Sequence, residues 1–246
     1  MRPPLVAVLL ACVVVFVACG GDAGSSEPSI ATPTPTIDFA AEARRLVVDA
    51  VFSAEDLPGY ERPGADGLQS QAGLSDACDI FDPDVVFADA VATAASGAYV
   101  GVLDDQLVNL AGVYRTVEDA SAALAQTQGL RERCEDEFEA AVEQVALDFL
   151  DGFGIDLGLF STIEVAIIDL DPTAVGDEAV GYRMNVNVNL ILTSQQYNLD
   201  AIVVREGRVV GALIYGRFGQ PDDSVETELL RLMAGKLSAV NASLPE

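Results

Sequence analysis

The stretch from Val180 to Phe218 constrains the fold more than any other part of the chain. In its first part, apolar residues alternate with the three asparagines Asn185, Asn187 and Asn189. A period of two is typical of a strand that lies with one face on a core. We therefore expect the apolar residues of this strand to be buried and the asparagines to lie on its other face.

Two further apolar runs follow this strand, and each begins after a short polar link. Leu199–Val204 follows Thr193–Gln196, and Val209–Tyr215 follows Arg205–Arg208. Short polar links between apolar runs are typical of hairpins. The stretch is therefore predicted to form a three-stranded antiparallel meander.

Patterns elsewhere in the chain add strands and helices to this meander. Further strands are expected at Tyr99–Leu103, Leu107–Tyr114 and Thr162–Leu170. Helical spacing of apolar residues predicts helices at Asp38–Phe52, from Thr116 towards Phe149 as one helix or two, and from Asp222 or Asp223 to Val240. Strands beside separate helices indicate the α+β class, with an antiparallel sheet of about five or six strands and helices packed on one face.

Charge and composition exclude several classes of function. Acidic residues outnumber basic residues 39 to 13, which gives a net charge of −26, and such a surface repels nucleic acid. The chain has no histidine, so Ser-His-Asp and Cys-His catalysis and histidine metal sites are excluded. Motifs of nucleophilic hydrolases and of phosphate or dinucleotide binding are also absent, so we expect no catalytic residue, metal or cofactor.

The beginning of the chain has the features of an export signal. Residues 1–18 have a short basic start followed by the apolar run Leu5–Ala18, which is shorter than the roughly 20 residues that a membrane-spanning helix needs. The run ends in small residues before Cys19, an arrangement that resembles a bacterial lipobox, in which the cysteine is acylated. Cys12 is a second candidate for lipidation, and an ordinary signal peptide or an uncleaved anchor are the other interpretations.

Residues 19–37 are rich in Gly, Ser, Pro and Thr, so we expect a disordered tether that begins at the lipidated Cys19. Residues 38–246 are then a single extracytoplasmic domain. A lipid anchor and a tether together predict a domain held close to the outside of the cell membrane.

Cys78 and Cys134 are the two cysteines within the predicted domain. Pairing is the usual state of cysteines in exported proteins, so we expect a disulfide between them. A pair of free thiols or a metal site is the alternative, although two cysteines without histidine make a poor zinc site.

Short motifs in the predicted domain resemble those of a known family. They include AEDLPGY after the first helix, VYRTVEDASAAL before Cys134, and VGDEAVGYR before VVREGRVVGALIY. Together they look like the extracellular sensor domains of the PknH type and related small bacterial lipoproteins. This resemblance implies a non-enzymatic binding module. Those domains commonly carry two disulfides, whereas this chain can form only one in its folded part, and we transfer no functional residues.

The three asparagines are the candidate ligand face. Their amides offer donors and acceptors, and Tyr182, Tyr197 and Tyr215 are expected nearby for stacking. The alternative is an ordinary solvated sheet face. Acidic residues also gather around Cys78 (Asp76, Asp79, Asp82 and Asp84) and before the meander (Asp169, Asp171, Asp177 and Glu178), without the spacing of an EF-hand, so we interpret them as solvated loops.

These observations together predict a membrane-anchored extracytoplasmic lipoprotein that acts as a non-enzymatic ligand-binding or sensor-type module. Its partners are the membrane, through the lipid anchor, and an unknown extracellular ligand or component of the cell envelope. The alternatives are a secreted carboxylate-based hydrolase and a carrier of an apolar molecule. A buried carboxylate pair facing a cleft favours the hydrolase, and a large apolar cavity favours the carrier.

Overall fold

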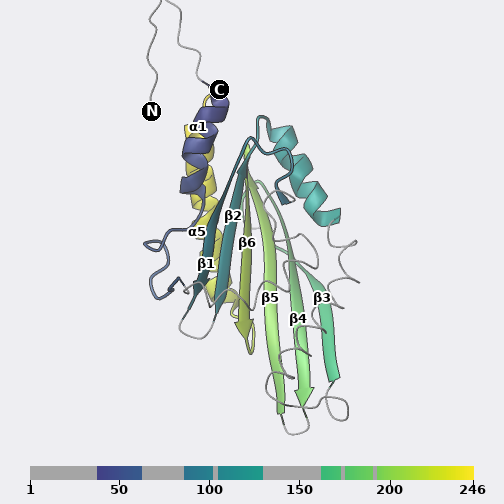
Figure 1. The fold of residues 1–246 in the computed structure, drawn as a ribbon. Coiled ribbons are helices and arrows are strands. Elements are labelled where there is room, and N and C mark those ends of the chain that lie inside the picture. Colours follow the sequence, from purple (N-terminus) through teal and green to yellow (C-terminus); the bar gives the residue numbers. More distant parts are fainter. Residues whose placement is uncertain (1–37, 63–85, 102–104, 130–161, 173–174, 191–192) are drawn as a thin grey trace, which may run out of the picture. The chain divides into compact units, whose positions relative to one another are not determined.

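A computed structural model of the chain describes residues 38–62, 86–101, 105–129, 162–172, 175–190 and 193–246 (Figure 1). All of them belong to one unit, Ile37–Glu246. The predicted signal peptide, the predicted tether and the candidate residues Cys12, Cys19, Cys78 and Cys134 lie outside the described residues.

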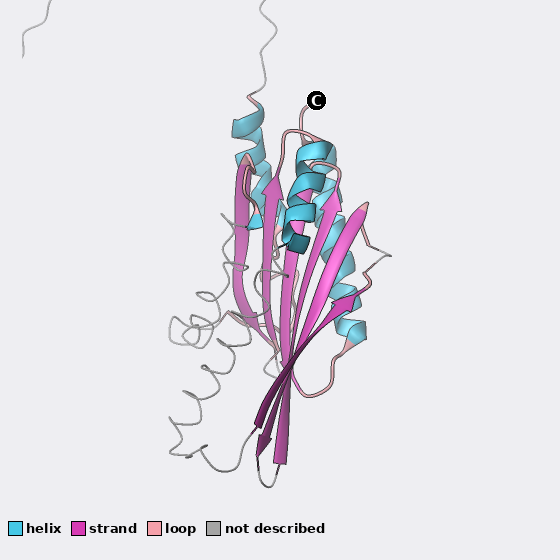
Figure 2. Ribbon diagram, turned by 90° about the vertical axis from the view of Figure 1, so that its right-hand side faces the viewer, coloured by secondary structure: helices cyan, strands magenta, loops and turns pink. Residues whose placement is uncertain are grey.

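Within the described ranges, six strands form one antiparallel sheet. They are β1 (Ala92–Val100), β2 (Gln106–Val113), β3 (Thr162–Leu170), β4 (Glu178–Leu190), β5 (Thr193–Glu206) and β6 (Val209–Phe218). Their order across the sheet is β1-β2-β6-β5-β4-β3, so the last strand of the sequence lies next to the second (Figure 1). The sheet is strongly twisted along its strands (Figure 2). The predicted α+β class and the antiparallel sheet are confirmed.

The predicted meander is present as β4, β5 and β6. β5 and β6 are joined by a two-residue turn, because Glu206 pairs with Val209. Gly207 begins this turn with a φ of 58°, a conformation that glycine adopts without strain. The first link differs from the prediction, since Thr193–Gln196 belongs to β5 and pairs with the end of β4.

The helices begin where capping side chains satisfy free backbone N–H groups. The carboxylate of Asp38 caps α1 (Phe39–Leu46), which continues as the 3-10 helix η1 (Val47–Ala50). Asp222 caps α5 (Asp223–Ser243). The hydroxyl of Thr116 accepts a hydrogen bond from the Asp119 backbone N–H, and a helix occupies 117–129, which agrees with the helix predicted to start at Thr116. Among the described residues, no helix combines the length and apolar character needed to span a membrane.

The helices lie on both faces of the sheet, whereas the sequence analysis expected them on one. Alternate residues of β6 show this, because Leu213 belongs to the core cluster that contains residues of α1, η1 and α5. Ala212 and Ile214 belong to a second cluster, which contains residues of the helix at 117–129. The physical reason is visible in β6, where Val209–Tyr215 is almost continuously apolar rather than alternating. A strand with two apolar faces is stable only when both are covered.

Candidate functional site

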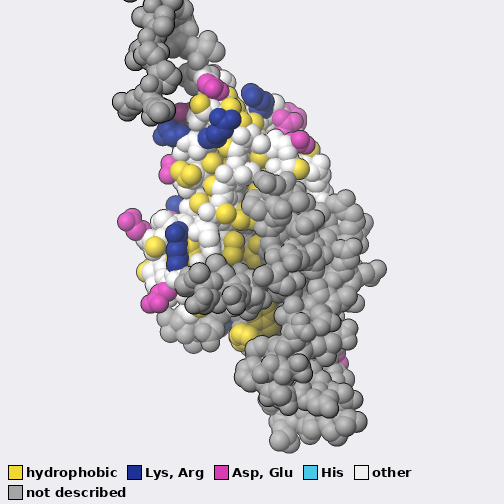
Figure 3. Space-filling model, viewed as in Figure 1, with side chains coloured by type: hydrophobic (Ala, Val, Ile, Leu, Met, Phe, Trp, Pro, Cys, Tyr) yellow, Lys and Arg dark blue, Asp and Glu magenta, His cyan; other side chains and the backbone are white. Residues whose placement is uncertain are grey.

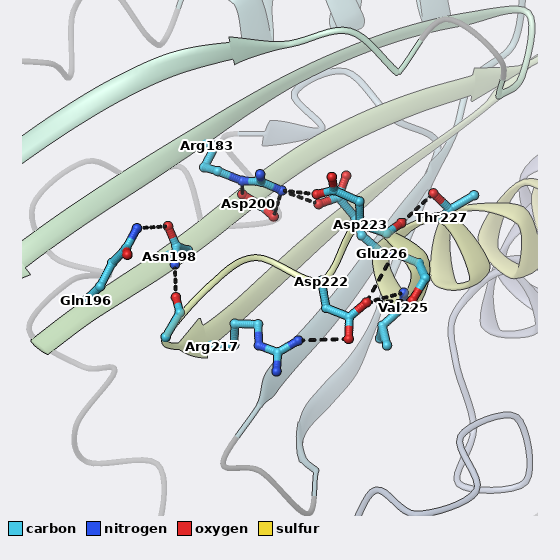
Figure 4. A network of polar contacts seen from close by, with 12 residues as sticks. Arg183, Gln196, Asn198, Asp200, Arg217, Asp222, Asp223, Val225, Glu226 and Thr227 are labelled. Carbon is cyan, nitrogen blue, oxygen red and sulfur yellow. Dashed lines mark hydrogen bonds and ion pairs between the residues drawn. The ribbon is translucent and has the colours of Figure 1, made fainter.

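The sheet face that packs against α5 changes from apolar to polar part of the way along its strands. On β5, Val204 and Ile202 belong to the core beneath α5. The next side chains on the same face are Asp200, Asn198 and Gln196, because alternate residues of a strand share a face. The polar part begins where α5 begins, since the Asp200 carboxylate and the first turn of α5 bind the same arginine (Figure 4).

β4 makes the same change, and its polar residues pair directly with those of β5. The pairs are Arg183 with Asp200, Asn185 with Asn198, and Asn187 with Gln196. Arg217 of β6 pairs with Asn198 on the other side of β5. We call these seven residues the polar strip.

Arg183 joins β4, β5 and α5 at the end of the polar strip that lies next to α5 (Figure 4). Its Nε lies 2.7 Å from Oδ1 of Asp200 and its Nη2 lies 2.8 Å from Oδ2, which is a bidentate pair. The same Nη2 donates to Oε2 of Glu226 at 2.8 Å and to Oδ1 of Asp223 at 3.3 Å, both on α5. The bond to Asp200 is the main reason that the pKa of Arg183 is raised.

Glu226 is the most perturbed carboxyl group of this cluster. Its side chain is 13% exposed, and it lies against Arg183 near the Asp200 carboxylate. Burial, together with hydrogen bonding to Asp200 and that group's negative charge, raises the pKa of Glu226 to about 8. Glu226 therefore keeps its proton to a higher pH than an exposed glutamate does.

Arg217 makes a second ionic cluster beside the first. Its Nη1 lies 3.2 Å from Oδ2 of Asp222, which caps α5 (Figure 4). Its Nε lies 3.6 Å from Oδ1 of Asp105. The hydroxyl of Tyr215 donates to Oδ2 of Asp105 at 3.3 Å. Burial and the nearby Asp105 carboxylate raise the pKa of Tyr215, so its hydroxyl stays protonated.

The amides on β5 are held by a chain of hydrogen bonds. Nε2 of Gln220 donates to Oε1 of Gln196 at 3.0 Å, and Nε2 of Gln196 donates to Oδ1 of Asn198 at 3.2 Å. Nδ2 of Asn198 then donates to the backbone carbonyl of Gly219. The orientation of each of these amides is therefore fixed by its neighbours.

The amides on β4 are different. Asn185 and Asn187 are partly buried, and within the described ranges their side chains have no hydrogen-bond partner. Each offers two donors and one acceptor at the surface. Because two residues along a strand span about 6.6 Å, the two amides form a short row of that spacing. They are the part of the polar strip that is available to a ligand.

The structure separates the residues that the sequence analysis grouped as a ligand face. Asn189 shares the face of Asn185 and Asn187, as alternation predicted, and it has an interaction of its own. Tyr182 and Tyr197 lie on the opposite face, because Tyr182 alternates with Arg183 and Tyr197 pairs with Val186. Tyr215 does share the face of the polar strip, but it is buried.

Tyr197 has a packing role on that opposite face. Its ring lies 5.1 Å from the ring of Phe218, measured between centroids, and it packs against the apolar core there. Its hydroxyl occupies the space where a Cβ of Gly216 would lie, at 2.1 Å, so a side chain at position 216 would collide with it. Burial raises the pKa of Tyr197 to about 12. The expectation of tyrosines beside the asparagines is corrected for Tyr182 and Tyr197.

Two of the acidic residues before the meander form ion pairs. Asp177 and Glu178 bind the guanidinium of Arg205 at 3.1 Å each, and the hydroxyl of Ser121 donates to Glu178. The acidic residues around Cys78 lie outside the described residues. In the part of the chain that the structure describes, no group of three or more acidic or cysteine side chains is arranged to hold a metal ion.

The sequence analysis missed most of the polar strip. It did not single out Arg183, Asp200 or Asn198, nor Glu226 of α5, which binds Arg183. One signal was present, since Gln196, Asn198 and Asp200 alternate with Tyr197 and Leu199 as the asparagines of β4 alternate with apolar residues. Treating Thr193–Gln196 as a turn hid this second alternating run.

The described residues define an α+β domain built on a six-stranded antiparallel sheet, with a polar strip on the face of α5. Among solved structures, the chain is similar to the extracellular domain of PknH from Mycobacterium tuberculosis, with a TM-score of 0.45 and 9% identity. The similarity covers 81% of this chain and 97% of that chain. That domain is of the type that the sequence motifs resemble. No protein-family model and no curated protein sequence matches the chain.

Proposed function

We propose that the chain is an exported, lipid-anchored protein whose domain binds an extracellular ligand on the polar strip without converting it chemically. The lipobox-like sequence at Cys19 and the composition of residues 19–37 support the anchor. In this proposal, the domain faces the outside of the cell membrane and reports or retains a ligand there.

The observation that carries the binding function is the contrast between the two neighbouring strands. On β5 the amides are used by one another, whereas Asn185 and Asn187 on β4 have no partner among the described residues. Partly buried amides without partners lose water contacts, and a ligand that supplies hydrogen bonds restores them. The fixed β5 amides and the ion pair of Arg183 make the surroundings of the two asparagines rigid, which favours binding.

The charged groups of the strip support binding rather than catalysis. Both oxygens of Asp200 accept hydrogen bonds from Arg183, so this carboxylate is not free to act as a base or a nucleophile. Arg217 is likewise shared between Asp222 and Asp105.

A carboxylate-based hydrolase is the second candidate function, because one observation favours it. Glu226, with its pKa raised to about 8, lies near a second carboxyl group, and glycoside hydrolases use a general acid whose pKa is raised in this way. If this function is correct, Glu226→Gln abolishes an activity on glycans that the unmodified protein shows. The carrier hypothesis has no supporting observation among the described residues.

Native mass spectrometry of the full-length protein, purified in detergent from its own host, tests the proposed function. We expect a retained ligand that is lost from the Asn187→Ala variant. Gln126→Ala is the matched control, since it removes an exposed amide from the helix at 117–129. Retention of the same ligand by all three proteins would show that the polar strip is not the binding site, and a protein without any ligand would contradict the proposal.

A further inference from the structure

The geometry points to a ligand class for this site. We propose that Asn185 and Asn187 bind the backbone of an extended peptide of neutral or basic character, which lies along β4 on the face of the polar strip. This inference rests on the binding function proposed above, and it adds the chemical nature of the ligand.

The spacing of the two amides matches the repeat of an extended peptide. Asn185 and Asn187 are two residues apart on a regular strand, so their side chains repeat every 6.6 Å or so along it. An extended peptide has the same repeat, because it too advances about 3.3 Å per residue. A peptide that runs along β4 therefore presents an equivalent backbone group to each asparagine, and the match persists over successive residue pairs.

The chemistry of the two side chains is the second argument. An asparagine amide has donors and an acceptor in one plane, as a peptide unit does. One asparagine can accept from a backbone N–H and donate to a backbone C=O of the ligand at the same time. The neighbouring amides of Gln196 and Asn198 are already used, so Asn185 and Asn187 direct the ligand to β4 rather than to β5.

The neighbouring strand β3 supplies the third argument. On the same face, Ala166 lies beside Asn185, Glu164 beside Asn187 and Ile168 beside Arg183. All three are exposed, and Ile168 is 44% exposed. The small Ala166 leaves room beside Asn185, Ile168 offers an apolar contact, and Glu164 attracts a basic side chain. The net charge of −26 also disfavours an acidic ligand.

The ion pairs of the polar strip agree with this charge preference. On the face drawn in Figure 3, basic side chains lie among acidic ones and do not form a separate patch. The basic residues of the polar strip, Arg183 and Arg217, are neutralised by carboxylates. An acidic peptide would therefore meet no free cation on this strip.

The test uses the full-length chain in detergent and two immobilised arrays, one of short random-sequence peptides and one of cell-envelope oligosaccharides. We expect retention on peptides and none on oligosaccharides. The Asn185→Ala/Asn187→Ala variant is expected to bind at least tenfold more weakly, with Gln126→Ala unchanged. Melting temperatures of all variants are measured first, so that a loss of binding is not a loss of folding.

The peptide that binds most tightly is then methylated at one backbone nitrogen at a time. We expect binding to weaken at every second position, because each asparagine accepts from one backbone N–H per two residues. Equal binding by the double variant and the unmodified protein would overturn the inference and point to an edge of the sheet instead. Retention on oligosaccharides alone would overturn it as well.

The two proposals fail in different ways. A retained native ligand that is not a peptide, and that Asn187→Ala releases, leaves the binding function standing and removes the peptide inference. The absence of any retained ligand, together with no binding on either array, contradicts both.

Discussion

Replacing Arg183 is the change that should destabilise the domain most clearly. The Arg183 side chain is 11% exposed and that of Asp200 is 4% exposed, and three carboxyl groups bind this one guanidinium. Arg183→Met keeps much of the apolar stem but leaves Asp200 buried without a counter-charge. Removing one partner of a buried ion pair destabilises a protein by about 3–5 kcal/mol.

This loss of stability corresponds to a lower melting temperature. For a domain of roughly 200 residues, each kcal/mol lowers the melting temperature by about 2–4 °C, so Arg183→Met should lower it by about 6–20 °C. Thermal unfolding followed by circular dichroism measures this. Arg231→Ala, which removes an exposed arginine of α5, is the matched control, and it should change stability by less than about 0.5 kcal/mol.

A double variant separates the loss of the pair from the loss of packing. Arg183→Met/Asp200→Leu removes both charges, and apolar replacement of a buried ion pair is often neutral or stabilising. We expect it to recover most of the stability lost in Arg183→Met. A single variant that loses less than about 1 kcal/mol, or a double variant as unstable as the single one, would refute the reasoning.

The remaining predictions concern the anchor, the disulfide, the core and the pH dependence. Cys19→Ala should release the protein from membranes in a fractionation, and a variant that stays bound would show another mode of attachment. A thiol assay of the unfolded, unreduced protein should find Cys78 and Cys134 paired. Free thiols at both positions would show that they are not. Val186→Asp should prevent folding, as judged by circular dichroism, because an unpaired buried charge costs several kcal/mol. Because the pKa of Glu226 rises from 4.5 to about 8 on folding, its contribution to stability is full below pH 4.5 and is lost as the pH rises through about 8. Urea unfolding at several pH values should show this decline in the unmodified protein and a smaller one in Glu226→Gln, and equal declines would mean that Glu226 is not the group responsible.

The sequence predicted the elements that depend on local patterns. The alternation around Asn185, the helix caps at Asp38 and Thr116, and the apolar run of β6 are all readable within a few residues. Each of these signals has a direct structural cause, which is the period of a strand, a free N–H group or a buried face. The α+β class and the meander were therefore predictable.

The polar strip depends on contacts between residues that are far apart in the sequence. The periodicity of the sequence does not predict such contacts. Arg183 meets Glu226 only because α5 packs back over the sheet, 43 residues later in the chain. The side of the sheet on which Tyr197 lies follows from its pairing with Val186, which required the correct start of β5. A shift of a few residues in the predicted turn was enough to place Tyr197 beside the wrong neighbours. Tyr182 lies on the same strand as Asn185, so its place on the opposite face follows from alternation alone.

The strand order has a consequence for how this chain acquires its structure. β2 lies between β1 and β6, and its pairs with β6 join residues as far apart as Gln106 and Gly216. Any machinery that delivers the chain N-terminus first, whether a ribosome or an export channel, releases β1 and β2 long before the strand that completes their sheet. The first half of the domain must therefore wait, and a chain truncated before Val209 lacks the strand that joins β2 to β5. The sheet of this domain is completed only at the end of synthesis or export, when its C-terminal segment arrives.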